Sequence, residues 1–150
     1  MNLWLVDASI LLASEDPDDE HHEDSRRLLS GSDPLTTLDL AFYEVTNVAV
    51  RSWRDQASAR RLRGRVTAVA DDAGLVRADA HLLEDAAAIA DEHGISAYDA
   101  AYVAAARAVS ARLVSCDLRD LVSRDLAVLP SFAVRQPGDQ QPGPPAPTSP

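Results

Sequence analysis

The sequence predicts one α/β domain of three layers, in which a mostly parallel sheet of about five strands is covered by helices on both faces. Short apolar segments alternate along the chain with longer segments of helical periodicity, a pattern typical of strand–helix–strand units. The 150 residues are 46% hydrophobic, which is enough for a single core but not for two full domains. Right-handed crossovers between parallel strands would then place helices on both sides of the sheet.

The predicted strands are short apolar runs bounded by turn or capping residues. The first ends at Asp7, the third lies between Gly74 and Asp79, and the fourth ends directly before Asp117. The fifth run, near the end of the domain, is only a possible strand. In chain order, the predicted strands are residues 3–6, 35–38, 75–78, 113–116 and 132–134.

Helices are predicted between these strands from periodic apolar positions and from residues that end helices. Leu40, Tyr43, Asn47 and Val50 recur at helical spacing. Gly94 stands where a left-handed residue ends a helix. Apart from the helix that ends at Gly94, the predicted helices are residues 10–13, 25–29, 39–53, 58–70 and 97–109.

Two segments are predicted to lie outside the packed core. Residues 15–24 contain seven acids and two histidines, so we expect a solvated loop there. Residues 136–150 hold six of the nine prolines and no large apolar residue. We therefore expect a disordered proline-rich tail after a domain of residues 1–135.

The composition excludes several kinds of chemistry. All 14 basic residues are Arg, so the chain lacks the Lys of a P-loop, of Schiff-base catalysis and of a receiver-like phosphorylation domain. The net charge of −10 means that any nucleic-acid contact must be local. The single Cys116 cannot form an intrachain disulfide, and the first apolar run is broken at Asp7. We therefore expect a cytoplasmic protein with no secretory signal and no membrane segment.

Four acidic residues are candidates for one site at the carboxyl edge of the sheet, where parallel α/β folds have their functional crevice. Asp7 and Asp117 each follow a predicted strand directly. Asp99 lies in the first turn of the helix before the fourth strand, and Glu44 lies among apolar residues in mid-helix. Converging carboxylates repel one another unless a cation neutralises them, and Mg²⁺ or Mn²⁺ prefers such oxygen ligands. The set therefore predicts metal-assisted hydrolysis. Zinc does not suit an isolated cysteine and four scattered histidines.

Three polar residues could support these acids. Ser9 and Ser115 each lie two residues from a strand-end acid, and Asn47 shares a helical face with Glu44. Each of the three could orient a carboxylate or hold a water molecule, and each could equally serve structure alone.

The candidate acids also have structural interpretations. The strand-end acids could cap the helices that follow them, and Glu44 could be an ordinary surface residue. Ser96 and Asp99 have the spacing of a capping box. The joint pattern, rather than any one residue, favours a metal site. A dehalogenase-like phosphatase is disfavoured because it would need an aspartate where Ser9 stands.

These residues resemble those of a PIN domain and, within that superfamily, the VapC-type toxins of bacterial toxin–antitoxin pairs. The matching segments, in the family's order, are LVDAS (5–9), YEVTN (43–47), SAYDAAYVA (96–104) and LVSCDL (113–118). The resemblance spans residues 2–134 and implies a Mg²⁺- or Mn²⁺-dependent endoribonuclease. Its acidic set would be Asp7, Glu44, Asp99 and Asp117. It further implies a homodimer with an RNA substrate, inhibited by a small VapB-type antitoxin. Ser115 stands where Thr is common, a change that keeps the hydroxyl, and the family does not require the proline-rich tail.

One basic block could act beside this acidic set. It consists of Arg51, Arg54, Arg60, Arg61, Arg63 and Arg65. The block could contact RNA phosphates, pair with an acidic antitoxin segment, or form a solvated helix face.

For the whole chain, the rival interpretation is a PIN-like module that binds RNA or protein without cutting. Addition of Mn²⁺ and mixed RNA separates the two, because a binder leaves the RNA intact.

Overall fold

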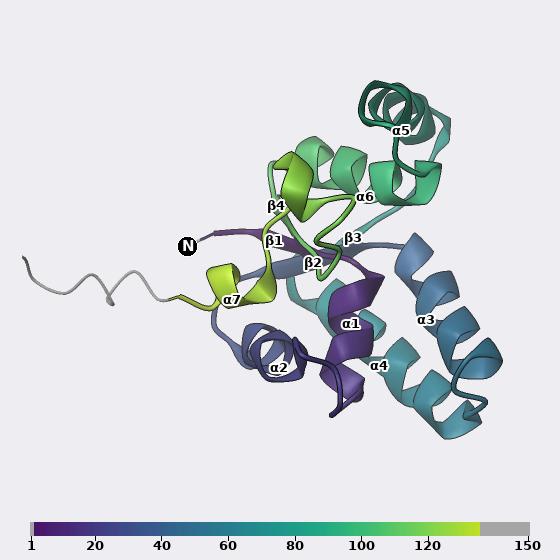
Figure 1. Cartoon of the computed structure of the whole chain (residues 1–150), viewed down its shortest axis with the longest axis vertical. Helices are drawn as coiled ribbons and strands as arrows, with labels where there is room; N and C mark the ends of the chain where they lie inside the picture. Colours follow the sequence, from purple (N-terminus) through teal and green to yellow (C-terminus); the bar gives the residue numbers. More distant parts are fainter. Residues whose placement is uncertain (1, 136–150) are drawn as a thin grey trace, which may run out of the picture.

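A four-stranded parallel sheet forms the centre of the computed structural model, which describes residues 2–135. The strands are β1 (Trp4–Val6), β2 (Leu35–Leu38), β3 (Leu75–Val76) and β4 (Arg112–Val114). Their order across the sheet is β3-β2-β1-β4 (Figure 1). The predicted α/β class with a parallel sheet is confirmed. The tail predicted at residues 136–150 lies outside the described residues.

Helices cover both faces of this sheet, which confirms the three predicted layers. Figure 1 shows α1, α2, α3, α4 and α7 on one side and α5 and α6 on the other. The helices are α1 (Ala8–Glu15), α2 (His22–Ser30), α3 (Leu40–Arg51), α4 (Gln56–Ala73), α5 (Ala80–His93), α6 (Ala97–Ala108) and α7 (Pro130–Ala133), with a 3₁₀ turn, η1, at Val122–Arg124.

The fifth strand predicted at residues 132–134 is wrong, because that segment belongs to α7. Pro130 fixes φ in the helical range at the first helical turn, where a backbone N–H donor is not needed. The position beside β4 is taken by Val128, which makes an isolated parallel bridge to Val114. Backbone hydrogen bonds of 2.9 and 3.0 Å join Val128 to both sides of that bridge. The edge of the sheet is therefore completed by one residue rather than by a strand.

Capping residues explain where several helices begin and end. Asp55, Asp79 and Ser96 accept hydrogen bonds from backbone N–H groups in the first turns of α4, α5 and α6. Gly94 ends α5 in the left-handed conformation that the sequence predicts, with φ of 65°. Contacts between neighbours in sequence therefore define the ends of these helices.

The acidic loop predicted at residues 15–24 is shorter than expected. Helix α1 extends to Glu15 and α2 begins at His22, so only residues 16–21 form turns. The Glu15 side chain is 9% exposed rather than solvated, because two arginines of α4 bind it. This contact between α1 and α4 explains the longer helix.

The core consists of two apolar clusters, one on each face of the sheet. Leu5 belongs to the cluster beneath α5 and α6, whereas its neighbours Trp4 and Val6 belong to the cluster beneath α1 and α4. Residues 100–106 of α6 are all buried. A fully buried Leu or Val contributes about 1.5–3 kcal/mol, so this packing holds the strand ends firmly. Among residues 2–135, no helix has both the length and the apolar composition needed to cross a bilayer.

Candidate active site at the carboxyl edge of the sheet

Asp7 lies at the carboxyl end of β1 and is 5% exposed. Its Oδ1 atom accepts hydrogen bonds from the Ser9 backbone N–H at 3.0 Å, the Ser9 hydroxyl, and the Ile10 N–H at 3.4 Å. Asp7 therefore caps α1, as one interpretation of the sequence allowed. None of these three bonds uses Oδ2, so capping by Asp7 is compatible with binding of a cation.

Two serines link Asp7 to the end of β4. The register pairs Val6 with Val114, which brings Ser115 beside the start of α1. The Ser9 and Ser115 hydroxyls are 3.3 Å apart, and Ser9 Oγ accepts a hydrogen bond from the Cys116 N–H at 2.8 Å. Ser115 Oγ accepts from the Asp117 N–H at 3.0 Å. The two predicted serines therefore form a polar bridge between the two strand-end acids.

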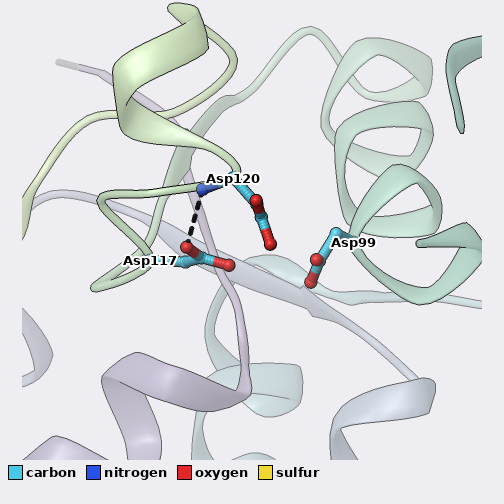
Figure 2. A group of neighbouring side chains, drawn as sticks. All are labelled: Asp99, Asp117 and Asp120. Carbon is cyan, nitrogen blue, oxygen red and sulfur yellow. Dashed lines mark hydrogen bonds between the residues drawn. The ribbon is translucent and has the colours of Figure 1, made fainter. Parts of the chain in front are cut away.

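A group of three carboxylates lies on the α6 side of this edge. One oxygen each of Asp99, Asp117 and Asp120 lies within 4.8 Å of the other two, and the three side chains point toward one another (Figure 2). Ser96 caps α6 by accepting from the Asp99 N–H at 3.1 Å, so the Asp99 carboxylate is not needed as the cap. Asp117 Oδ1 accepts from the Asp120 N–H at 2.9 Å. Predicted residues Asp99 and Asp117 are thus brought together.

Asp120 is a member of this group that the sequence analysis missed. It lies three residues after Asp117, in the turn that follows β4. That Asp-x-x-Asp spacing was a usable signal, because the turn closed by the Asp120 N–H brings both side chains to the same place.

Glu44 reaches the site from α3 and is half-buried. Its Oε1 atom is buried and has no hydrogen-bond partner among the described residues. Burial raises the pKa of Glu44, and the charges of Asp7 and Asp99 add to the rise. Glu44 therefore lies within electrostatic reach of the acids from β1 and α6.

The carboxylates destabilise one another's charged forms. Burial raises the pKa of Asp7 to about 6, hydrogen bonds from the serines limit the rise, and the charge of Asp99 adds to it. Burial also raises the pKa of Asp99, and the charges of Asp117 and Asp120 contribute. A divalent cation would remove this repulsion, and oxygen-only ligands suit Mg²⁺ or Mn²⁺.

Cys116 lies beside the acids but does not fit a nucleophile or a zinc ligand. Burial raises the pKa of its thiol to about 12, and the nearby charge of Asp7 contributes. The thiol is therefore protonated at neutral pH, and the reactive form is the thiolate.

Asn47 lies on an exposed part of α3. It is exposed and lines a surface hollow of about 450 Å³ with Tyr43, Arg51 and Arg63. Within residues 2–135, no hydrogen bond joins Asn47 to an acid of the site. In the described part of the chain, the Asn47 amide therefore makes no direct hydrogen bond to the Glu44 carboxylate, and its supporting role stays a prediction.

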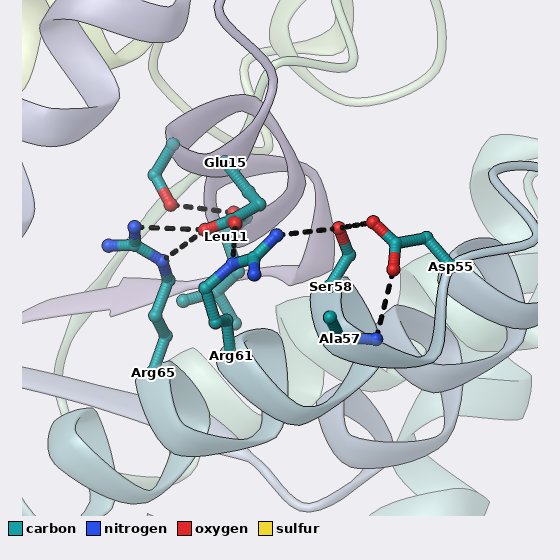
Figure 3. Close-up of polar contacts among 8 residues, drawn as sticks. Leu11, Glu15, Asp55, Ala57, Ser58, Arg61 and Arg65 are labelled. Carbon is teal, nitrogen blue, oxygen red and sulfur yellow. Dashed lines mark hydrogen bonds and ion pairs between the residues drawn. The ribbon is translucent and has the colours of Figure 1, made fainter.

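The basic block divides into two sets. Arg61 and Arg65 bind Glu15 at the end of α1, with 2.9 Å between Arg65 Nη2 and Glu15 Oε2 (Figure 3). Burial alone would raise the pKa of Glu15, but hydrogen bonds from the two arginines outweigh it and lower the pKa. The second set is exposed and forms no ion pair within the described part of the chain. It consists of Arg51, Arg54, Arg60 and Arg63.

The chain matches the PIN domain family over residues 4–124. It is 34% identical over 119 residues to Ribonuclease VapC3 of Pyrobaculum aerophilum, a match that covers 75% of this chain and 88% of that protein.

Solved structures agree in fold. A toxin–antitoxin complex from Klebsiella pneumoniae contains a chain with a TM-score of 0.65 and 16% identity, which aligns with 84% of this chain and 96% of its own length. VapC20 of Mycobacterium tuberculosis, described as a sarcin-ricin loop cleaving toxin, has a TM-score of 0.63 and 21% identity. That alignment covers 75% of this chain and 86% of VapC20. At these identities the likeness establishes the fold.

Proposed function

The chain belongs to the PIN domain family, and from that premise we propose that it is a metal-dependent endoribonuclease acting as the toxin of a toxin–antitoxin pair. The observation that carries the proposal is the acidic cluster at the carboxyl edge of the sheet. One oxygen from each of three carboxylates lies within 4.8 Å of the other two, and the charge of one of them, Asp99, adds to the raised pKa of both Asp7 and Glu44. The similarity to a protein named Ribonuclease VapC3 supports an RNA substrate.

The residues present fit Mg²⁺ or Mn²⁺. The donor set consists of carboxylates alone, and the buried Glu44 Oε1 has no partner within the described residues. Buried acceptors without partners are uncommon, and a bound cation would complement this one. We assign Asp7, Glu44, Asp99 and Asp117 as the ligand set, with Asp120 as an additional candidate.

The chain's own residues would prepare the site for phosphodiester hydrolysis. A divalent cation held there would activate water and offset the charge that develops on the phosphate. Ser9 and the first turn of α1 hold Asp7 Oδ1, which leaves Oδ2 for the site. The Asp120 N–H holds Asp117 Oδ1 in the same manner. These contacts orient the carboxylates before substrate arrives, so less reorganisation is needed during the reaction.

We further propose a homodimer, a VapB-type antitoxin as the inhibitory partner, and a cytoplasmic place of action on RNA. The similarity to a chain of the Klebsiella pneumoniae toxin–antitoxin complex supports a partner of that kind. The exposed set of the basic block supplies the candidates for RNA phosphates or an acidic antitoxin segment, because Arg61 and Arg65 are bound to Glu15. These candidates are Arg51, Arg54, Arg60 and Arg63.

Replacing Asp99 with Asn tests the proposal. Cleavage of a mixed RNA pool with Mn²⁺ should fall by at least about 100-fold if Asp99 is a ligand, because removal of a metal partner disables the hydrolytic centre. Mn²⁺ should also raise the melting temperature of the variant less than that of the parent, because stabilisation follows affinity for the folded state. Asp91→Asn on the exposed face of α5 is the matched control and should behave like the parent.

Two results would count against this function. Full nuclease activity in Asp99→Asn would remove Asp99 from the site. RNA that stays intact with the parent and Mn²⁺ would instead favour the non-cleaving PIN-like binding module.

A further inference from the structure

Tyr102 is a buried tyrosine whose hydroxyl has no hydrogen-bond partner among the described residues. It lies in α6, is 1% exposed, and packs within the apolar cluster on that face of the sheet. Unpartnered buried polar atoms are rare, because each loses its hydrogen bonds to water without replacement. A phenylalanine could fill the same space without that cost, so the hydroxyl itself requires an explanation.

Glu44 is the candidate acceptor for this hydroxyl; the charge of Asp7 and the backbone of Ala8 also act on it. Asp99 and Tyr102 are three residues apart in α6 and therefore lie on the same side of the helix. Both act on Glu44, since the charge of Asp99 raises the pKa of Glu44 whereas the Tyr102 hydroxyl lowers it. The Glu44 Oε1 atom is itself buried and unpartnered in the described part of the chain. A buried donor and a buried acceptor thus lie near each other without a hydrogen bond of normal geometry.

We propose that Tyr102 is a positioning residue of the metal site, whose hydroxyl donates to one carboxylate oxygen of Glu44 and leaves the other directed toward the cation. The inference rests on the proposed metal-dependent function. It assigns a role to a residue that otherwise looks like an ordinary core aromatic.

The chemistry of the two groups suits this role. A tyrosine hydroxyl has one proton to donate, and an ionised carboxylate has two acceptor oxygens. A ligand carboxylate held by such a donor keeps one orientation, and partners of this kind support metal affinity. Ring packing in the core fixes the hydroxyl, so the Glu44 side chain on α3 is the partner that adjusts.

Tyr102→Phe tests the inference, with Mn²⁺ affinity measured by titration calorimetry on the full chain. The substitution removes only the hydroxyl, so the metal-free variant should melt at the same temperature as the parent or higher. We expect Mn²⁺ affinity to fall by about tenfold to 100-fold, the usual loss when a partner of a ligand is removed. Tyr98→Phe is the matched control in the same helix. Its hydroxyl is on an exposed side chain, so its Mn²⁺ affinity should equal that of the parent.

A double-mutant cycle with Glu44→Gln locates the effect. If Tyr102 acts through Glu44, Tyr102→Phe should change Mn²⁺ affinity much less in the Glu44→Gln background than in the parent. An unchanged Mn²⁺ affinity in Tyr102→Phe, or an equal loss in both backgrounds, would overturn the inference. A parent that binds Mn²⁺ but leaves RNA intact would refute the nuclease proposal while the affinity comparison still decides the role of Tyr102.

Discussion

Replacing Asp7 with Asn should make the metal-free protein more resistant to unfolding at pH 7, although Asp7 caps α1. The pKa of Asp7 rises from 3.8 to about 6 on folding, chiefly because burial disfavours its charge. That rise in pKa corresponds to about 3 kcal/mol of unfolding free energy lost once the carboxyl is ionised. Asn keeps the side-chain oxygen that caps the helix, and loss of charge at the helix start costs up to about 1 kcal/mol. The net gain at pH 7 should be about 2 kcal/mol.

The gain should depend on pH in a defined direction. A carboxyl whose folded pKa is raised gives its full stabilisation below the unfolded pKa of 3.8 and loses it as pH rises through about 6. The parent should therefore lose stability between these values relative to Asp7→Asn, and the difference should level off above them. Because the neighbouring acids titrate together with Asp7, the shape of that difference belongs to the whole cluster.

Urea unfolding in the presence of a chelator, from pH 4 to pH 7.5, measures this difference. A gain of about 2 kcal/mol should also appear as a melting temperature about 4–8 °C higher at pH 7. Asp91→Asn, on the exposed part of α5, controls for the loss of one negative charge. Added Mn²⁺ should reverse the order, because the parent binds the ion more tightly. A stability difference between parent and Asp7→Asn that does not change across this pH range would refute the reasoning.

Three further variants test which of the charged side chains serve binding and which serve stability. Asp120→Asn should weaken Mn²⁺ binding by about tenfold, whereas Asp125→Asn in the exposed turn nearby should not, which calorimetry can measure. Arg60→Gln combined with Arg63→Gln should leave the melting temperature unchanged but weaken RNA or antitoxin binding and flatten its salt dependence. Arg61→Gln should instead lower the free energy of unfolding slightly and leave RNA or antitoxin binding unchanged, because it breaks a solvent-exposed ion pair between α4 and α1. If Arg61→Gln weakened binding as much as the double variant does, the separation into binding and stabilising arginines would be wrong.

Much of the fold was predictable because local signals agree with the tertiary structure. Asp7 and Gly94 mark ends of elements through capping and left-handed geometry, which depend on neighbours in sequence. The fifth strand failed because strand and helix signals conflict in a short apolar segment. Pro130 favours a helix in that segment, and Val128 pairs with Val114 at the edge of the sheet. Which residue pairs with the edge strand depends on the backbone groups of that strand that remain unpaired. Sequence patterns do not show these groups.

Some residues of the candidate site were likewise predictable from the sequence, and others were not. Asp7 and Asp117 were located by topology alone, since parallel strands end at one edge and their register brings the two ends together. Asn47 shows the limit of helical spacing, because a residue three positions from Glu44 still points to a surface hollow. The pairing of Arg61 with Glu15 was not predictable from sequence, since 46 residues separate the two.

One property of Tyr102 is visible in the sequence and another only in the folded structure. Its spacing from Asp99 showed that the two residues share a side of α6, but all of residues 100–106 are buried, so an aromatic residue there reads as core. What distinguishes Tyr102 is a buried hydroxyl with no hydrogen-bond partner among residues 2–135. Its relation to Glu44 arises only in the tertiary structure, when α3 and α6 are both in place. A polar atom in an otherwise apolar helical run, on the same side as a candidate ligand, is nonetheless visible in sequence. Because leaving such an atom unpaired is costly, its presence beside an acid that we propose as a metal ligand favours a positioning role over simple packing.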